Sequence, residues 1–177
     1  MLIVGILAIV FGYTYTGGSY PLAYHGLGDV FVVIFFGLVA TMGTYYVIVG
    51  DLSWSVFLLG LPLGLLANNI LVVNNYRDKE TDEAAGKRTL VVRFGRAFAR
   101  SQYAWQLAGA YFSLSVYVGL TQSFWACLAL ATIPMGTKLI VELRVTRGPA
   151  LNGLLGRSAK LLLAFSALLA LGIAFSG

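Results

Sequence analysis

A short polar segment holds most of the side chains in this chain that could take part in chemistry. It runs from Asn74 to Thr89 and reads NNYRDKETDEAAGKRT. Charged residues make up only 11% of the chain, yet eleven of the 12 basic and 7 acidic residues lie between Arg77 and Arg100. This concentration of charge in an otherwise apolar sequence makes the polar segment the first candidate for a functional site.

Two carboxylates in the polar segment have the spacing of a cation site. Asp78 and Asp82 are four residues apart, so in a helix they lie on one face one turn apart, with Asn74 a further turn back. Carboxylate and amide oxygens suit Mg²⁺, which completes its shell with water and substrate phosphates. Positive charge for such phosphates comes from Arg77, Lys87, Arg88 and Arg93. The alternative interpretation is a solvated loop of mixed charge beside a membrane.

The composition predicts an integral membrane protein. Hydrophobic residues make up 59% of the 177 residues, and the mean hydropathy is +0.84. Six apolar stretches are visible: Met1 to about Gly12, Val30–Val49, Trp54–Val73, Tyr103–Leu120, Phe124–Val141 and Leu161–Ser176. All but the first reach the length, roughly 17 to 20 residues, that crosses a hydrocarbon core of about 30 Å. We therefore expect an all-α, polytopic transmembrane bundle of about six helices over residues 1–177, with Met1 inside a helix that begins earlier.

The charges of the loops predict the orientation in the membrane. Residues 76–102 carry seven Lys and Arg, and residues 142–160 carry four, whereas the turns at 50–53 and 121–123 carry none. The positive-inside rule places both basic loops in the cytoplasm, and helix counting adds residues 14–29 to the same side. Nucleic acid is not an expected partner, because no basic face interleaved with aromatic residues lies outside the apolar stretches. The charge-free interiors of the apolar stretches also disfavour a transporter of ions or lipid diphosphates.

The polar segment resembles a motif of a known family. From Asn74 to Gly95 the pattern Asn-Asn-x-Arg-Asp-x-x-x-Asp-x-x-x-Gly-Lys-x-Thr-Leu-Val-Val-Arg-x-Gly is similar to the second aspartate-rich motif of the UbiA superfamily of membrane prenyltransferases. Its form is most similar to that of the menaquinone-pathway 1,4-dihydroxy-2-naphthoate polyprenyltransferases. The loop that ends at Asp29 and the Phe35-Phe36-Gly37 run also resemble that subfamily.

The resemblance implies a nine-helix fold in the cell inner membrane, with an active site that faces the cytoplasm and a lateral path for a lipid tail. The six stretches would be the last six helices. The first motif of the family, Asn-Asp-x-x-Asp-x-x-x-Asp, has no match in this sequence. We therefore expect the first three helices to be missing and the 177-residue chain alone to be inactive. The alternative function is a noncatalytic membrane subunit or a truncated pseudoenzyme.

The resemblance also implies partners and roles for individual residues. Mg²⁺ would bridge carboxylates and the diphosphate of a polyprenyl donor, and the aromatic acceptor, 1,4-dihydroxy-2-naphthoate, would lose carbon dioxide. The expected metal ligands are Asp78 and Asp82, supported by Asn74 and Asn75. The expected diphosphate contacts, or partners of the carboxylates, are Arg77, Lys87 and Arg88. Weaker candidates for the acceptor site are Tyr20, Tyr24 and Asp29, although Asp29 could instead cap the helix that follows it.

Overall fold

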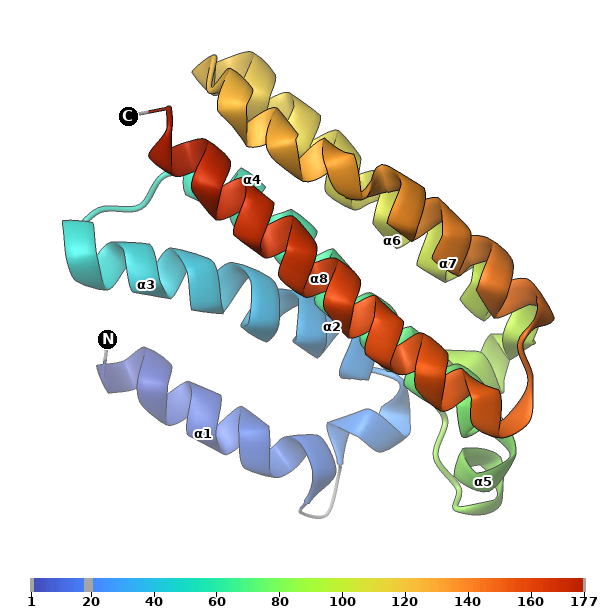
Figure 1. Cartoon of the computed structure of the whole chain (residues 1–177). Coiled ribbons are helices and arrows are strands. Elements are labelled where there is room, and N and C mark those ends of the chain that lie inside the picture. The colour runs from blue at the N-terminus through green and yellow to red at the C-terminus, as the bar shows by residue number, and fades with distance from the viewer. Residues whose placement is uncertain (1, 18–20, 177) are drawn as a thin grey trace.

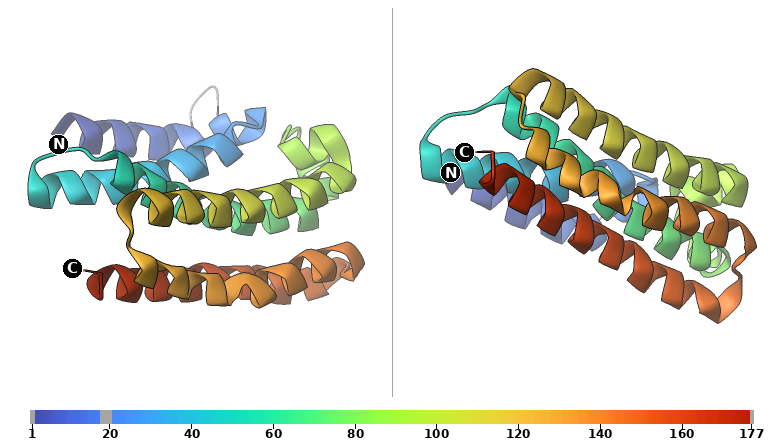
Figure 2. Two further views of the ribbon diagram at one scale, coloured as in Figure 1. Left: turned by 90° about the horizontal axis from the view of Figure 1, so that it is seen from above. Right: turned by 45° about the horizontal axis from the view of Figure 1, so that its top comes forward.

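The computed structural model describes residues 2–17 and 21–176 and builds them from helices and connecting turns alone (Figure 1). This confirms the all-α prediction. The helices are α1 (Leu2–Thr16), η1 (Leu22–His25), α2 (Gly28–Val32), η2 (Val33–Val39), α3 (Ala40–Val49), α4 (Trp54–Arg77), α5 (Lys79–Ala84), α6 (Leu90–Thr121), η3 (Phe124–Thr132), α7 (Ile133–Val145), η4 (Gly148–Ala150) and α8 (Leu151–Ala174). The views in Figure 2 show α1 and α3 on one side, α4 with α6 in the middle, and α7 with α8 on the other side.

Four helical stretches of the described chain are long and apolar enough to cross a membrane. They are Gly28–Val49, Trp54–Arg77, Phe124–Val145 and Gly148–Ala174. Each contains most of a predicted apolar stretch. Helix α1 has 15 residues, fewer than a bilayer requires. Helix α6 is long enough at 32 residues, but polar side chains such as Gln102 and Gln106 lower its hydropathy.

Helix α4 forms the centre of the bundle because small residues let its neighbours approach closely. A Cβ atom built on Gly64 would lie 2.5 Å from the backbone oxygen of Val33, and one built on Gly37 would lie 2.6 Å from the Cα atom of Gly64. Helices α4 and η2 therefore pack backbone against backbone, as small-residue interfaces in membranes do. This contact holds η2 against the middle of α4.

Two predicted boundaries are wrong. The loop predicted over residues 142–160 is mostly helical, because α8 begins at Leu151. Leu151, Leu154 and Leu161 are buried on one face of α8, while Arg157 on another face pairs with Glu142 at 2.9 Å. Helix α6 likewise begins thirteen residues before the predicted start at Tyr103, with a break in its backbone at Gly95 (φ 81°). Amphipathic turns at the membrane surface extend both helices beyond their apolar stretches.

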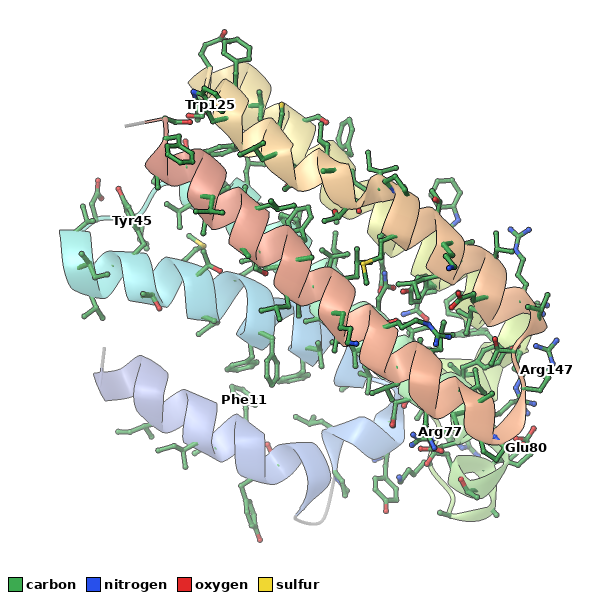
Figure 3. The ribbon with its side chains drawn as sticks, in the orientation of Figure 1. Phe11, Tyr45, Arg77, Glu80, Trp125 and Arg147 are labelled. Atoms are coloured by element: carbon green, nitrogen blue, oxygen red, sulfur yellow. The ribbon has the colours of Figure 1, made fainter. Side chains whose placement is uncertain are left out.

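The three loops predicted to share one membrane face do meet at one end of the bundle. The backbone N–H of Arg88 donates to the carbonyl of Tyr24 at 2.8 Å, which joins the first loop to the polar segment. Arg77 Nη1 donates to Asn152 Oδ1 at 2.6 Å, which joins the polar segment to the start of α8. In Figure 3, Arg77, Glu80 and Arg147 lie at this end, whereas Tyr45 and Trp125 lie at the other.

Candidate functional site

The polar segment continues the helical path of α4, with a break in the helix at Asp78. Helix α4 ends at Arg77 and α5 begins at Lys79, with Asp78 at φ −92° and ψ 10° between them. The Asp78 N–H still donates to the Asn74 carbonyl (3.0 Å), and the Asp82 N–H to the Asp78 carbonyl (2.8 Å). The helical spacing predicted for Asn74, Asp78 and Asp82 is therefore kept across the break, and all three line one cavity.

This polar cavity has a volume of about 190 Å³ and collects residues from four parts of the chain. Its lining comes from the η1–α2 region, from the end of α4, from α5 and from the turn before α6. The lining residues are Gly26, Gly28, Asp29, Leu71, Asn74, Asn75, Asp78, Asp82, Lys87 and Thr89. Six of the predicted site residues thus share one cavity, including Asp29 from a distant loop.

Arg77 lies beside the polar cavity without lining it, and its guanidinium donates hydrogen bonds to three other side chains. Its Nε and Nη2 atoms donate to the two carboxylate oxygens of Asp78, each at 2.6 Å. Nη2 also donates to Asn74 Oδ1 at 2.9 Å, and Nη1 donates to Asn152. The bidentate pair with Arg77 lowers the pKa of Asp78 below its usual value, so this carboxyl group is ionised at neutral pH.

Lys87 is the cation that faces the polar cavity. Its Nζ atom lies 2.9 Å from Asp82 Oδ1 and 5.5 Å from the centre of the Tyr24 ring. The hydrogen bond to Asp82 raises the pKa of Lys87 above its usual value, which keeps the ammonium group charged. The Asp82 residue is 6% exposed, so the charge pair is screened from water mainly on the carboxylate side.

Asp29 is held by two side chains and does not cap its helix. Helix α2 begins at Gly28, with Leu27 in the capping position. The buried Asp29 Oδ1 accepts hydrogen bonds from Gln102 Nε2 (2.5 Å) and Asn68 Nδ2 (3.2 Å). The capping alternative is therefore wrong, because the carboxylate is turned toward α4 and α6, where amide donors are available. The hydrogen bond from Asn68 links α4 to α2.

The first loop is tied to the polar segment by backbone contacts. Besides the Arg88–Tyr24 hydrogen bond, Arg93 Nη2 donates to the carbonyl of His25 at 2.8 Å. Gly26 has a positive φ of 77°, and a Cβ atom there would lie 2.8 Å from the Arg88 carbonyl. The Arg88 side chain is not among the residues that line the polar cavity, and its contact with diphosphate stays a prediction. Tyr20 lies outside the described residues.

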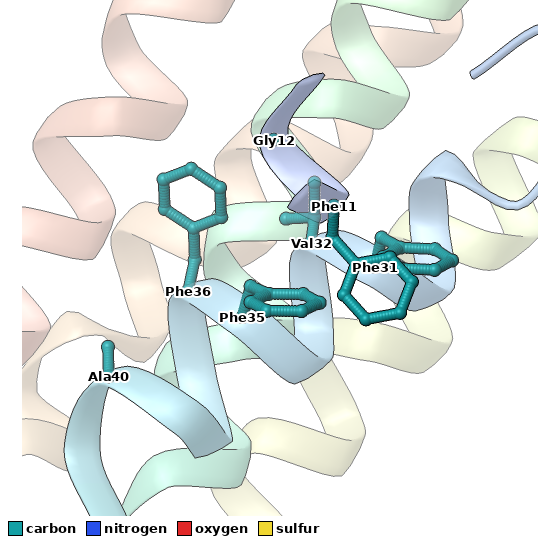
Figure 4. Close-up of a pocket in the computed structure, with 7 residues that line it drawn as sticks. All are labelled: Phe11, Gly12, Phe31, Val32, Phe35, Phe36 and Ala40. Atoms are coloured by element: carbon teal, nitrogen blue, oxygen red, sulfur yellow. The ribbon is translucent and has the colours of Figure 1, made fainter. Parts of the chain in front are cut away.

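An apolar cavity lies beside the polar one. It has a volume of about 640 Å³ and is open between α1 and the α2–η2 stretch (Figure 4). The rings of Phe31 and Phe35 stack with centroids 5.7 Å apart, and the Phe11 ring of α1 tilts against both. Asp29 lines the polar cavity, while Phe31 and Val32 line the apolar one. Helix α2 therefore connects a charged site to an apolar site within one turn.

The donor atoms of the polar cavity match Mg²⁺ in type. Asp78 and Asp82 offer carboxylate oxygens, and Asn75 offers an amide oxygen on the same cavity. Within the described chain, however, no three His, Cys, Asp or Glu side chains gather as a ready metal site. Arg77 also binds both oxygens of Asp78, so a cation at that carboxylate would compete with the guanidinium.

Three polar residues in or beside the site, Thr89, Gln102 and Asn152, were not predicted. Thr89 is buried in the cavity wall, and its Oγ1 accepts the N–H of Val92 at the start of α6. Gln102 binds Asp29, and Asn152 binds Arg77. A polar residue next to an apolar stretch, as at Gln102, is a signal that could have been used. Nothing local to Asn152 indicates its contact with Arg77, which is 75 residues away.

Comparison with known proteins agrees with this site. Residues 1–153 match the UbiA prenyltransferase family. The chain is 37% identical to the 1,4-dihydroxy-2-naphthoate octaprenyltransferase of Escherichia coli, over 99% of this chain and 58% of that protein. It is 35% identical to the protein of the same name from Mycobacterium tuberculosis, over 84% of this chain and 50% of that protein. It is 30% identical to the 2-carboxy-1,4-naphthoquinone phytyltransferase of Synechocystis, over 76% of this chain and 44% of that protein.

The chain thus spans about half the length of the curated relatives it matches. No solved structure matches it. The family match covers most of the chain, including the whole polar segment and the residues that line both cavities. On this evidence the chain belongs to the UbiA prenyltransferase family.

Proposed function

We propose that this chain forms part of an enzyme that transfers a polyprenyl group from polyprenyl diphosphate to 1,4-dihydroxy-2-naphthoate, with loss of carbon dioxide, to give the reduced, hydroquinone form of demethylmenaquinone. The observation that carries the proposal is the junction on α2, where Asp29 lines a charged cavity and Phe31 lines an apolar one. A polyprenyl diphosphate has the same division, with an anionic head and an apolar tail. The names of the relatives support the naphthoate acceptor.

The charged groups of the polar cavity suit the departure of a diphosphate. Lys87 keeps its ammonium charge because of Asp82, and it faces the space where negative charge would develop. Arg77 lies behind the cavity and holds Asp78 in place. Fixed cations in a partly enclosed site stabilise a leaving anion without first reorganising water. The same groups would do little for a neutral substrate.

Asp78 and Asp82 would hold Mg²⁺, with the amides of Asn74 and Asn75 as supporting oxygens. When bound, the cation would neutralise charge on the diphosphate and so favour its departure. Asp82 offers one carboxylate oxygen beyond the one that Lys87 binds. Asp78 becomes available only when the Arg77 guanidinium moves away, and the diphosphate itself is an anion that could attract it.

The reaction exchanges a carboxyl group for a prenyl group. The allylic carbon–oxygen bond breaks, and its electron pair leaves on the diphosphate. The electron-rich naphthoate ring forms the new carbon–carbon bond, and its carboxylate leaves as carbon dioxide, so that no oxidant or reductant is needed. Tyr24, whose ring lies beside Lys87, and Asp29, in the cavity wall, are our candidates for positioning the acceptor. We place the site on the cytoplasmic side of the cell inner membrane, because the loops around it are basic.

Product analysis tests this function. Membranes that contain the chain would be supplied with octaprenyl diphosphate, 1,4-dihydroxy-2-naphthoate and Mg²⁺, and the prenylated product would be detected by mass spectrometry. We expect no product from the chain alone, because its sequence contains only one of the two aspartate-rich motifs. Product should appear when a second membrane fragment with an Asn-Asp-x-x-Asp-x-x-x-Asp motif is coexpressed, since separately inserted helices can associate.

Each outcome of this assay has a defined meaning. Product from the pair that disappears on Asp82→Asn supports the proposal. No product from the pair, while both fragments are present and associated, favours the alternative of a noncatalytic subunit or pseudoenzyme. Turnover by the chain alone would show that one aspartate-rich motif is sufficient and would overturn the expected need for a second fragment.

A further inference from the structure

A second charged hollow lies away from the polar cavity, between α6 and α7. Its volume is about 550 Å³, and it is lined by Ala97, Arg100, Ser101, Ala104, Trp105 and Arg144. None of these lining residues is acidic. The hollow belongs to neither cavity of the proposed enzyme site, and the inference drawn from it does not depend on the proposed function.

The two arginines of this hollow differ from the other arginines nearby. On α6, Arg93 donates to backbone carbonyls and Arg96 forms a bidentate pair with Glu80. The guanidinium of Arg100, on the same helix, has no hydrogen bond or ion pair with any described residue. It remains available for a ligand.

The same contrast holds at the end of α7. Arg157 pairs with Glu142, and Arg147 donates to the carbonyls of Arg144 and Thr146. The Arg144 guanidinium itself has no partner among the described side chains. Two unpaired like charges on neighbouring helices repel each other, and an anion between them would remove that repulsion.

The position of Arg100 and Arg144 in the molecule indicates which kind of anion they would bind. Arg100 and Ser101 lie just before the apolar stretch that begins at Tyr103, and Arg144 lies at the end of α7, so the hollow is at the boundary of the membrane. Trp105 is 76% exposed, one turn after Ser101, as expected of an aromatic residue at the lipid interface.

Apolar surface continues from the hollow toward the membrane interior. Val141, one turn before Arg144 on α7 and so on its membrane side, is 59% exposed. Phosphate groups bind guanidinium side chains through paired hydrogen bonds, and basic pockets between membrane helices on the cytoplasmic side take anionic lipid headgroups. We propose that Arg100 and Arg144 bind the phosphodiester headgroup of an anionic phospholipid, with Trp105 at the glycerol level and an acyl chain along Val141.

Tryptophan quenching by brominated lipids tests this site. The chain would carry Trp54→Phe and Trp125→Phe, so that Trp105 is its only tryptophan, and would be reconstituted with brominated phosphatidylglycerol or brominated phosphatidylcholine diluted into ordinary lipid. At about 5-fold in affinity for each arginine near a lipid surface, the pair predicts a preference of about 30-fold for the anionic lipid. High salt should reduce this preference in the same protein, because the attraction is electrostatic.

Matched variants separate the site from general surface charge. Arg100→Gln with Arg144→Gln should abolish the preference, whereas Arg147→Gln, which removes a nearby guanidinium already bonded to carbonyls, should leave it unchanged. Arg100→Lys with Arg144→Lys keeps both charges and should keep most of the preference, which guards against a variant that fails to fold.

Three results would overturn the assignment. The first is equal quenching of the Trp105-only chain by both lipids, at low and at high salt. The second is an unchanged preference in the double glutamine variant. The third is loss of the preference in millimolar inorganic phosphate, which would mean that the hollow binds a soluble anion instead of a lipid headgroup.

Discussion

Replacing Asp82 by Asn should lower the turnover of the enzyme far more than the stability of its fold. The two side chains have the same shape, so the change removes one negative charge from the polar cavity and little else. Asp82 loses its charge-assisted hydrogen bond with Lys87, now at 2.9 Å, and the cavity loses one of its two expected metal carboxylates. The pKa of Lys87, which Asp82 raises, should fall back toward its usual value.

The two effects should differ greatly in size. The Lys87 side chain is 34% exposed, so solvent screening limits the loss of folding free energy to about 0.5–1 kcal/mol. Removal of one group that stabilises transition-state charge typically lowers turnover by about 100-fold or more, or about 2.7 kcal/mol of barrier. Asp82→Asn should therefore insert and fold almost normally but turn over very slowly.

Two assays measure this difference on the same samples. Thermal unfolding in detergent reports the stability, and product formation by the coexpressed pair of fragments reports the turnover. The matched control is Glu83→Gln, which makes the same chemical change at the neighbouring residue, where the exposed side chain pairs, among the described residues, only with Lys79 at 3.2 Å. Its turnover should stay near normal. Near-normal turnover of Asp82→Asn would refute the assignment of this carboxylate to the site, and an equal loss in both variants would attribute the effect to general charge.

Other predictions follow from single contacts. Gly64→Val should prevent stable packing of α4 on η2, because the first added carbon would already lie 2.5 Å from a backbone oxygen; a large fall in the thermal midpoint, absent from the same change at Gly119, which has no atom near its missing Cβ and no positive φ, would be the measured result. The pKa of Asp78 is lowered by Arg77, so this pair stabilises the fold above the usual carboxyl pKa of 3.8 and loses that contribution as the pH falls through the lowered value. Asp78→Asn should remove this acid-sensitive part of a stability-versus-pH curve, and an unchanged curve would contradict it. In a cysteine-free chain, a cysteine at Thr81 should react with a membrane-impermeant reagent only from the cytoplasmic side and one at Asp51 only from the other side; labelling of both from one side would contradict the orientation.

Much of the polar site was predictable because its residues are close in sequence. Asn74, Asp78 and Asp82 follow one another at helical spacing, and this spacing survives the break between α4 and α5. The apolar stretches predicted the helices for the same reason, since the length of a membrane core fixes how many apolar residues a crossing needs. Local patterns were sufficient wherever one helix determined the arrangement.

The remaining features depend on contacts between distant segments. The amide donors that hold Asp29 come from α4 and α6, and no local pattern distinguishes this arrangement from a helix cap. The contact between Arg77 and Asn152 depends on where α8 begins, and that helix starts at Leu151, ten residues before the apolar stretch predicted from Leu161. Arg88 was assigned to the site from its neighbours, but its backbone, not its side chain, makes the contact with the first loop.

Binding of a prenyl diphosphate to this chain tests the central claim most directly. A non-reacting analogue, farnesyl thiodiphosphate, would be titrated into the reconstituted chain with and without Mg²⁺. We expect binding that requires Mg²⁺, is displaced by inorganic diphosphate, and weakens about 10-fold in Asp82→Asn and in Lys87→Gln, on the scale of one lost hydrogen bond to a charged group. Glu83→Gln should bind as the unaltered chain does. Equal affinity of all four proteins for the analogue would contradict the claim that the polar cavity is the diphosphate site.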